Sequence, residues 1–172
     1  MSENRFRFAT VDDVAAIHEL IERAYRGPEA LSSWTSEAGL LSTPRTSAEE
    51  IAKHVGRDEC RFVVAERDGR VVGCALIEKH GVEGYFGMLA IHPGLQGTGL
   101  GKALLARVES SVRELWHCNA MTLKVINLRH EIIGWYERRG YALTGRRDPF
   151  PFELHPASGR DDFDFVEMKK IF

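Results

Sequence analysis

The sequence lacks the features of several protein classes. Its 172 residues include three cysteines, Cys60, Cys74 and Cys118, which show no C-x-x-C spacing. The seven histidines form no H-x-x-x-H or H-E-x-x-H pair, so the spacing predicts no structural metal. An odd number of cysteines without metal spacing argues against a disulfide framework and favours a reducing compartment.

Long hydrophobic runs and an excess of one charge are also missing. No apolar stretch approaches the length of a membrane span, and residues 1–7 have no apolar core typical of a signal peptide. The formal net charge is −2, which gives no electrostatic case for binding nucleic acid or an anionic membrane. We therefore expect a cytoplasmic protein with no nucleic-acid and no membrane partner.

What is present is typical of one soluble globular unit. Charged residues make up 28% and hydrophobic residues 44% of the chain. The length suits one domain with its own core, so residues 1–172 are predicted to form a single domain.

Hydrophobic periodicity predicts an α/β protein. Period-two patterns indicate strands, and i, i+3, i+4 spacing with capping residues indicates helices. The strands are expected at 5–8, 61–66, 71–78, 85–91, 121–126, 141–144 and 163–171, and the helices at 10–26, 47–55, 100–115 and 131–139. This order predicts a mixed three-layer α/β domain with an antiparallel first half and helical crossovers later. The final strand, with Phe163 and Phe165, and the proline-rich loop 148–162 are expected to form an exposed edge suited to a homodimer.

A glycine-rich turn, Gln96-Gly-Thr-Gly99-Leu-Gly101, follows the fourth strand and opens the third helix. Strand, glycine turn and helix in succession present backbone N–H groups to an anion. The spacing is not the G-x-G-x-x-G of dinucleotide-binding folds. It is not a P-loop either, because Ala103 follows Gly101-Lys102 where that motif has Ser or Thr. A plain glycine-rich connection without a ligand is the alternative.

The same residues resemble the acyl-CoA motif of the GNAT N-acetyltransferase superfamily, Gln/Arg-x-x-Gly-x-Gly/Ala. Gln96, Gly99 and Gly101 fill its fixed positions, and Tyr136 with Gly140-Tyr141 matches a second block downstream. The resemblance extends over nearly the whole chain. It implies a GNAT-like acyl-CoA N-acyltransferase fold, with a central mixed sheet of about seven strands flanked by about four helices.

The resemblance also implies acetyl-CoA as the acyl-donor substrate, with no metal. Backbone N–H groups of the turn would cradle the pyrophosphate at the helix N-terminus; the residues are Gln96, Gly97, Thr98, Gly99, Leu100, Gly101 and Lys102. The pantetheine arm would pair with Leu89, Ala90 and Ile91 on a strand that separates from its neighbour. An N–H near Leu89 would polarise the thioester carbonyl, and Gly87 either gives the acyl group room or marks a bulge.

Tyr136 matches the tyrosine that protonates the departing thiolate in this superfamily; a buried structural tyrosine is the alternative. Many members carry an asparagine seven residues before that tyrosine, where this chain has Arg129. The nearest asparagine is Asn127. Either residue is predicted to hold the CoA arm or a phosphate, and the alternative for both is a loop residue capping the next helix.

The general base and the acceptor are less determined. Glu78, His80 and Glu83 lie in the region where family members place a base, but each also suits a solvated strand end. In this superfamily the segment that corresponds to the weakly patterned residues 29–46 faces the acceptor. The resemblance therefore implies that Trp34, Glu37 and Arg45 shape the choice of acceptor. Glu37 suits a cationic amine and Arg45 suits a carboxylate, so their charges leave both acceptors open.

Together these residues predict transfer of an acetyl group from acetyl-CoA to a primary amine of a small molecule or peptide. The amine would attack directly in a ternary complex, because no cysteine or serine stands in the motif as a covalent relay. The alternative is a catalytically weak acyl-CoA-binding or sensor protein, motivated by Arg129 and the undetermined base.

Overall fold

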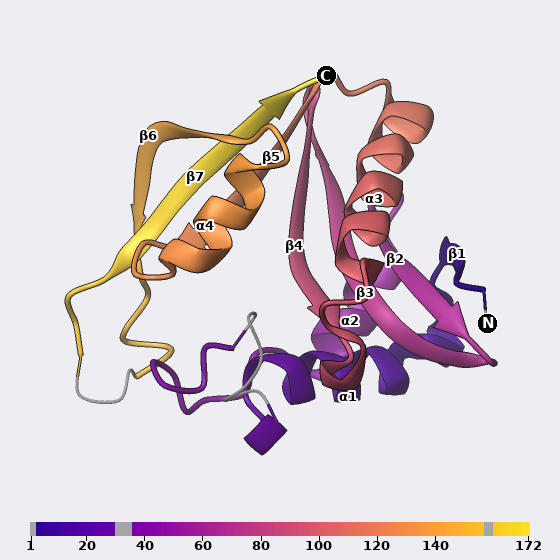
Figure 1. The fold of residues 1–172 in the computed structure, drawn as a ribbon, viewed down its shortest axis with the longest axis horizontal. Helices are drawn as coiled ribbons and strands as arrows, with labels where there is room; N and C mark the ends of the chain where they lie inside the picture. The colour runs from indigo at the N-terminus through magenta and orange to yellow at the C-terminus, as the bar shows by residue number, and fades with distance from the viewer. Residues whose placement is uncertain (1–2, 30–35, 157–159) are drawn as a thin grey trace.

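The computed structural model describes residues 3–29, 36–156 and 160–172, which form a seven-stranded sheet with helices on both faces (Figure 1). The strands are β1 (Arg5–Phe8), β2 (Cys60–Arg67), β3 (Arg70–His80), β4 (Glu83–Ile91), β5 (Ala120–Ile126), β6 (Ala142–Pro149) and β7 (Asp164–Ile171). The helices are α1 (Val14–Tyr25), α2 (Ala48–Val55), α3 (Leu100–Trp116) and α4 (His130–Glu137). The predicted order of elements is confirmed.

The strand order across the sheet is β1-β2-β3-β4-β5-β7-β6. Only β4 and β5 pair in parallel, and all other neighbouring strands are antiparallel. The mixed sheet predicted from the sequence is therefore present. Within the described ranges, no helix is both long and apolar enough to cross a membrane.

The β4–β5 pair separates after a short contact. Pairing joins Glu83–Tyr85 to Ala120–Thr122 and goes no further, and Figure 1 shows the two strands diverging from that point. On its other side β4 bulges against β3, where the register shifts between Cys74 and Leu76, and Met88 has φ = 50°. A bulge bends its strand and increases its twist. The part of β4 after Tyr85 thus has no strand partner on the β5 side.

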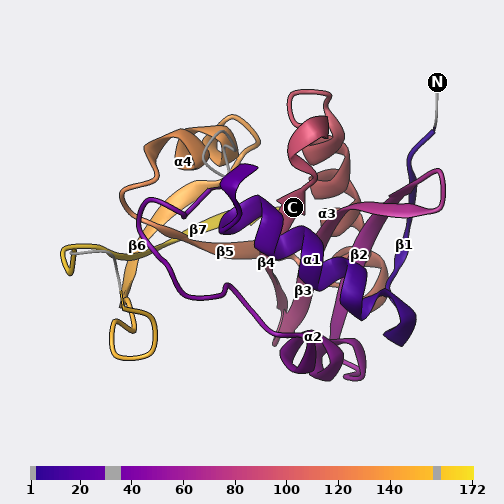
Figure 2. The same cartoon turned by 90° about the horizontal axis from the view of Figure 1, so that it is seen from below.

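The helices lie on opposite faces of the sheet, as the view from below shows (Figure 2). Two apolar layers hold them there. On one face, α1 and α2 bury Ile17, Ile21 and Ile51 against β2 and β3. On the other face, α3 and α4 cover Ile77 and Phe86. This packing fixes α4 beside the point where β4 and β5 diverge.

The prediction that the final strand forms an exposed edge is wrong. β7 lies between β5 and β6, and Phe163 just before it is 4% exposed. The edges of the sheet are β1 and β6. β6 also runs to Pro149, beyond the predicted 141–144, because Asp148 and Pro149 pair with β7 and an edge strand tolerates proline. A homodimer stays a prediction, without this edge to support it.

Candidate active site

The glycine turn connects the free end of β4 to the first turn of α3. Gly97 has φ = 78° and Gly99 has φ = 87°, a left-handed conformation that favours glycine. Nothing lies within 4 Å of where a Cβ would stand on either residue. The turn is held from inside, since the Thr98 hydroxyl donates to the Leu95 carbonyl at 2.6 Å. Its backbone is therefore open to close approach by a ligand, and the first N–H groups of α3 have no helical acceptor.

A cavity of about 250 Å³ adjoins the turn, lined by Gln96, Gly97, Gly99, Gly101 and Lys102, by Ile91, and by Trp135 and Arg139 from the α4 end. The Arg139 guanidinium carbon stands 3.6 Å from the centre of the Trp135 ring, and its Nη1 donates to the Trp135 carbonyl at 2.8 Å. Arg139 Nε is buried, and nothing in the described part of the chain accepts its hydrogen bond. A buried unpaired donor is rare in proteins, so this wall of the cavity suits an anion.

Sequence reasoning missed Arg139. Trp135 and Arg139 stand four residues apart, so they stack along one face at the end of α4. The sequence shows that spacing. It does not show which face of α4 lies against the glycine turn.

A second cavity of about 60 Å³ opens where β4 and β5 diverge. Its lining includes Leu89 from β4, Val125 from β5, Tyr25 at the end of α1, and Tyr136 from α4. The Tyr136 side chain is nearly buried, and its ring packs edge-on against Phe86 with centroids 5.7 Å apart. Its hydroxyl has no hydrogen-bond partner among the described residues. Burial raises the pKa of Tyr136 well above its ordinary value, so the hydroxyl is protonated at neutral pH and can donate.

Tyr25 fixes the bulged part of β4. Its hydroxyl donates to the Leu89 carbonyl at 2.8 Å, and burial raises the pKa of Tyr25 to about 12. The side chains of the predicted pantetheine-binding segment are buried, Leu89 and Ile91 in the apolar layer under α3 and Ala90 in the layer under α1. β5 does not pair with this segment.

Charged residues gather at this cavity and at a neighbouring one, which shares Glu37 and Arg45 with it and which Arg26 also lines. Arg26 Nη1 lies 2.8 Å from Glu37 Oε2, and Arg129 Nη1 lies 3.4 Å from Glu37 Oε1. Arg45 also lines the cavity, with its guanidinium carbon 5.5 Å from the centre of the Tyr25 ring. Glu37 therefore forms ion pairs with two of these guanidinium groups and, at longer range, raises the pKa of the third, Arg45. The four side chains together carry a net positive charge.

Neither of the two candidates for the CoA arm lines the cavity beside the glycine turn. Asn127 Oδ1 accepts the Asp164 N–H at 3.0 Å, so this amide connects β5 to β7. Arg129 precedes α4 and contacts Glu37 at the second cavity. A contact of either residue with CoA stays a prediction.

The structure places the candidate general bases at different sites with different partners. Glu83 forms an ion pair with Lys169, and Glu78 lies 3.1 Å from His80 Nε2. None of these three lines the β4–β5 cavity, whereas Glu37 does. Gly87 lines this cavity and also stands next to the bulge in β4. Its position is therefore compatible with both expectations, room for the acyl group and a bulge. Trp34 lies outside the described residues.

Comparison with known proteins agrees with this geometry. Residues 14–141 match the model of the acetyltransferase (GNAT) family. An amino-acid acetyltransferase of Ralstonia nicotianae is 34% identical over 167 residues, covering 96% of this chain and 32% of the relative. The chain spans about a third of the length of the curated relatives it matches.

Solved structures share the fold at low sequence identity. The ribosomal-protein-S18-alanine N-acetyltransferase of Escherichia coli superposes with a TM-score of 0.74 at 18% identity, covering 98% of this chain and 94% of the other. A putative acetyltransferase of Salmonella typhimurium, solved with its cofactor acetyl-CoA, superposes with a TM-score of 0.71 at 22% identity, covering 99% and 94%.

Proposed function

Because the chain belongs to the acetyltransferase (GNAT) family, we propose that it transfers an acetyl group from acetyl-CoA to the primary amine of a small acceptor that also carries a carboxylate. One observation carries the proposal. The unpartnered hydroxyl of Tyr136 faces the gap between β4 and β5, and the free part of β4 leads from that gap to the glycine turn.

The chain's residues fit the donor. The open turn at Gly97 and Gly99 offers backbone N–H groups to a pyrophosphate, and the helix dipole of α3 favours negative charge at this end. Lys102 and Arg139 add positive charge to the same cavity, and the buried Nε of Arg139 is a donor in need of an acceptor. The segment of β4 that has no partner on the β5 side suits the amides of a pantetheine arm.

Acetyl-CoA supplies a thioester whose carbonyl carbon an amine nitrogen attacks. As the new C–N bond forms and the C–S bond breaks, the sulfur takes the electron pair and needs a proton. Tyr136 Oη is protonated and has no competing acceptor among the described residues, so it serves as the general acid. Its position on α4 is fixed by packing against Phe86 and Tyr141.

The acceptor follows from the charges at the gap. Glu37 is engaged by Arg26 and Arg129, which leaves Arg45 as the cation without a carboxylate in contact among the described residues. A guanidinium matches a carboxylate in geometry and charge. The names of the curated relatives, amino-acid acetyltransferases, agree with such an acceptor. These charges and names favour an acceptor that carries a carboxylate over a purely cationic one.

The attacking amine must also lose a proton. Glu37 is the carboxylate that lines the gap, and we assign it to order the acceptor and the water that takes this proton. Among the described residues that line the gap there is no serine or cysteine, which favours direct attack in a ternary complex over a covalent acyl-enzyme.

The test is thiol release from acetyl-CoA with a panel of amines, each product identified by mass spectrometry. Amino acids and their α-amides form matched pairs that differ in the carboxylate. Since the carboxylate also raises the pKa of the neighbouring amine, rates are compared per concentration of neutral amine. Turnover that favours the acids supports the proposal. Binding of acetyl-CoA by calorimetry without turnover on any amine would instead favour the acyl-CoA sensor.

A further inference from the structure

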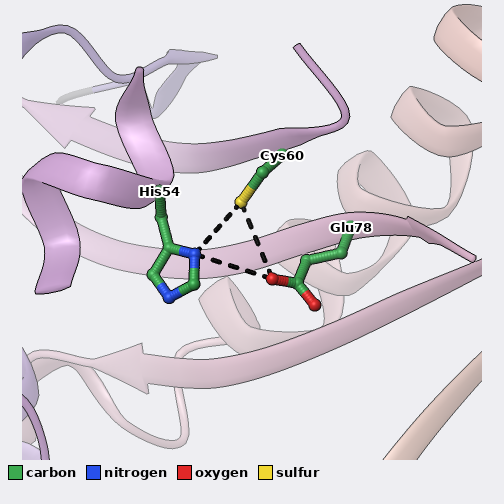
Figure 3. Close-up of side chains that lie close together, drawn as sticks. All are labelled: His54, Cys60 and Glu78. Carbon is green, nitrogen blue, oxygen red and sulfur yellow. Dashed lines mark hydrogen bonds and ion pairs between the residues drawn. The ribbon is translucent and has the colours of Figure 1, made fainter. Parts of the chain in front are cut away.

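Three side chains of ligand type meet at the end of the sheet where α2 passes into β2. They are His54, Cys60 and Glu78, and Figure 3 shows their ligand atoms turned toward one another. His54 Nδ1 lies 3.4 Å from Cys60 Sγ and 3.6 Å from Glu78 Oε1, and the sulfur lies 3.9 Å from that oxygen. None of the three lines the cavity beside the glycine turn or the cavity between β4 and β5.

These spacings are those of ligands around one small cation. A tetrahedral zinc ion, with a Zn–S bond of about 2.3 Å and Zn–N and Zn–O bonds of about 2.0–2.1 Å, sets its ligand atoms about 3.3–3.6 Å apart. The observed separations exceed that range by a few tenths of an ångström at most. Thiolate with imidazole favours zinc over magnesium or calcium, which prefer oxygen ligands alone.

The fold brings the three residues together from separate elements. Cys60 and Glu78 are directly opposite each other on the antiparallel strands β2 and β3, so both side chains leave the sheet on the same face. His54 reaches them from the last turn of α2, and its ring meets the edge of Phe62 with centroids 6.3 Å apart. The sequence separations of 6 and 18 residues match no metal motif, so spacing alone does not reveal the cluster.

Two further side chains stand beyond the ligands, one within hydrogen-bond distance and one at ion-pair distance. Glu50 Oε1 lies 3.9 Å from His54 Nε2, the ring nitrogen that faces away from the cluster. His80 Nε2 lies 3.1 Å from Glu78 Oε2, the oxygen that faces away. Histidine ligands in metal sites commonly give their second nitrogen to a carboxylate, which fixes the ring and its tautomer.

We propose that His54, Cys60 and Glu78 bind one Zn²⁺ ion, with water as the fourth ligand. Binding replaces the thiol proton of Cys60, which leaves to solvent, and the thiolate and the Glu78 carboxylate then balance the charge of the ion. Cys60 is fully buried, whereas the side chains of His54 and Glu78 are 15% and 19% exposed. The ion therefore has an entry path and would clip the end of α2 to the sheet.

Cobalt(II) titration of the chelator-treated protein tests the site, because a Co²⁺–thiolate bond gives a charge-transfer band in the near ultraviolet and a tetrahedral ion gives visible bands. The wild type should take up one equivalent of Co²⁺ with both signatures, and Zn²⁺ should displace it. Cys60→Ser should remove the charge-transfer band. The matched control is Cys118→Ser, since Cys118 is also buried but has no place in the cluster, and it should retain the band.

A second measurement does not depend on the sulfur. Zn²⁺ should raise the Tm of the wild type and leave the Tm of His54→Ala unchanged, while Glu50→Gln should weaken zinc binding by about 10- to 100-fold as an outer partner. Circular dichroism checks that each variant is folded. The proposal is overturned if the folded wild type binds no Co²⁺ with a thiolate signature, or if Cys60→Ser and His54→Ala bind zinc as tightly as the wild type.

Discussion

The Tyr25 hydroxyl, at the end of α1, donates a 2.8 Å hydrogen bond to the carbonyl oxygen of Leu89 in the bulged half of β4. This contact spans the helix layer and the sheet at the point where β4 leaves β5. It satisfies a backbone group that the sheet itself leaves without a β5 partner. The helix on one face of the sheet thus helps to set the geometry of the gap in which the acetyl group would be transferred.

Tyr25→Phe should therefore destabilise the protein by about 1–3 kcal/mol, because it leaves the Leu89 carbonyl buried without a partner. Urea unfolding measures this as a lower midpoint with an unchanged slope. The measured donor affinity should also fall, since the bulge is less firmly held. A change in unfolding free energy within about 0.5 kcal/mol, the range of a neutral surface substitution, would contradict this role of Tyr25.

Tyr136→Phe should lower kcat by about 10²- to 10⁴-fold, the usual contribution of a general acid, with little change in acetyl-CoA affinity. Tyr141→Phe is the matched control: Tyr141 packs against the same Phe86 ring, but its hydroxyl is bonded to Glu109 at 2.9 Å. The control should lose stability and keep kcat. Equal kcat in Tyr136→Phe and the wild type would remove Tyr136 from the catalytic role.

The pH dependence follows from the direction of the Tyr136 shift. Burial raises its pKa above the ordinary value of about 10, so the acid stays protonated throughout the alkaline range used in assays. The neighbouring carboxylate raises the pKa of the acceptor amine above the value of about 8 for the α-amino group of a peptide, and the neutral fraction of the amine grows across that range. Steady-state kcat/KM should thus rise with pH and level off. A falling limb below about pH 10 that disappears in Tyr136→Phe would show that the acid titrates normally.

Gly99→Ala should weaken acetyl-CoA binding and destabilise the protein by about 1–2 kcal/mol, because φ = 87° places an alanine in the left-handed region. Gly69→Ala is the control, since Gly69 has φ = 74° in the β2–β3 hairpin and equally open space around it. The two variants should show similar losses of stability by thermal unfolding. Only Gly99→Ala should change donor affinity by calorimetry, and equal affinities would count against the turn as the donor site.

The sequence predicts the order of elements and the donor turn because both rest on local patterns. Apolar spacing marks α1 and α3, and the conformation at Gly99 is a property of a few consecutive residues. Strand order is different, since it depends on how separate strands meet. The final strand alternates like an edge strand, yet β6 pairs with its outer side, so β7 is an interior strand.

Side-chain partners could not be predicted for the same reason. Glu37 is engaged by Arg26 and Arg129 from two other segments, and no spacing in the sequence shows that its charge is balanced. The position that carries asparagine in the resemblance holds Arg129, which lines the gap between β4 and β5 and pairs with Glu37. His54, Cys60 and Glu78 likewise meet only because α2 packs over β2 and β3.

The acceptor assay with a matched pair of substrates tests the central claim most directly. The quantity is the ratio of kcat/KM for an amino acid to that for its α-amide, measured with the wild type and with Arg45→Met. The wild type should favour the acid, and Arg45→Met should reduce this preference by about 10- to 100-fold, since hydrogen bonds to charged groups contribute about 1.5–3 kcal/mol. Arg146→Met, on the exposed edge strand β6, should leave the ratio unchanged. A wild-type ratio near or below one, unaffected by Arg45→Met, would contradict a carboxylate-bearing acceptor.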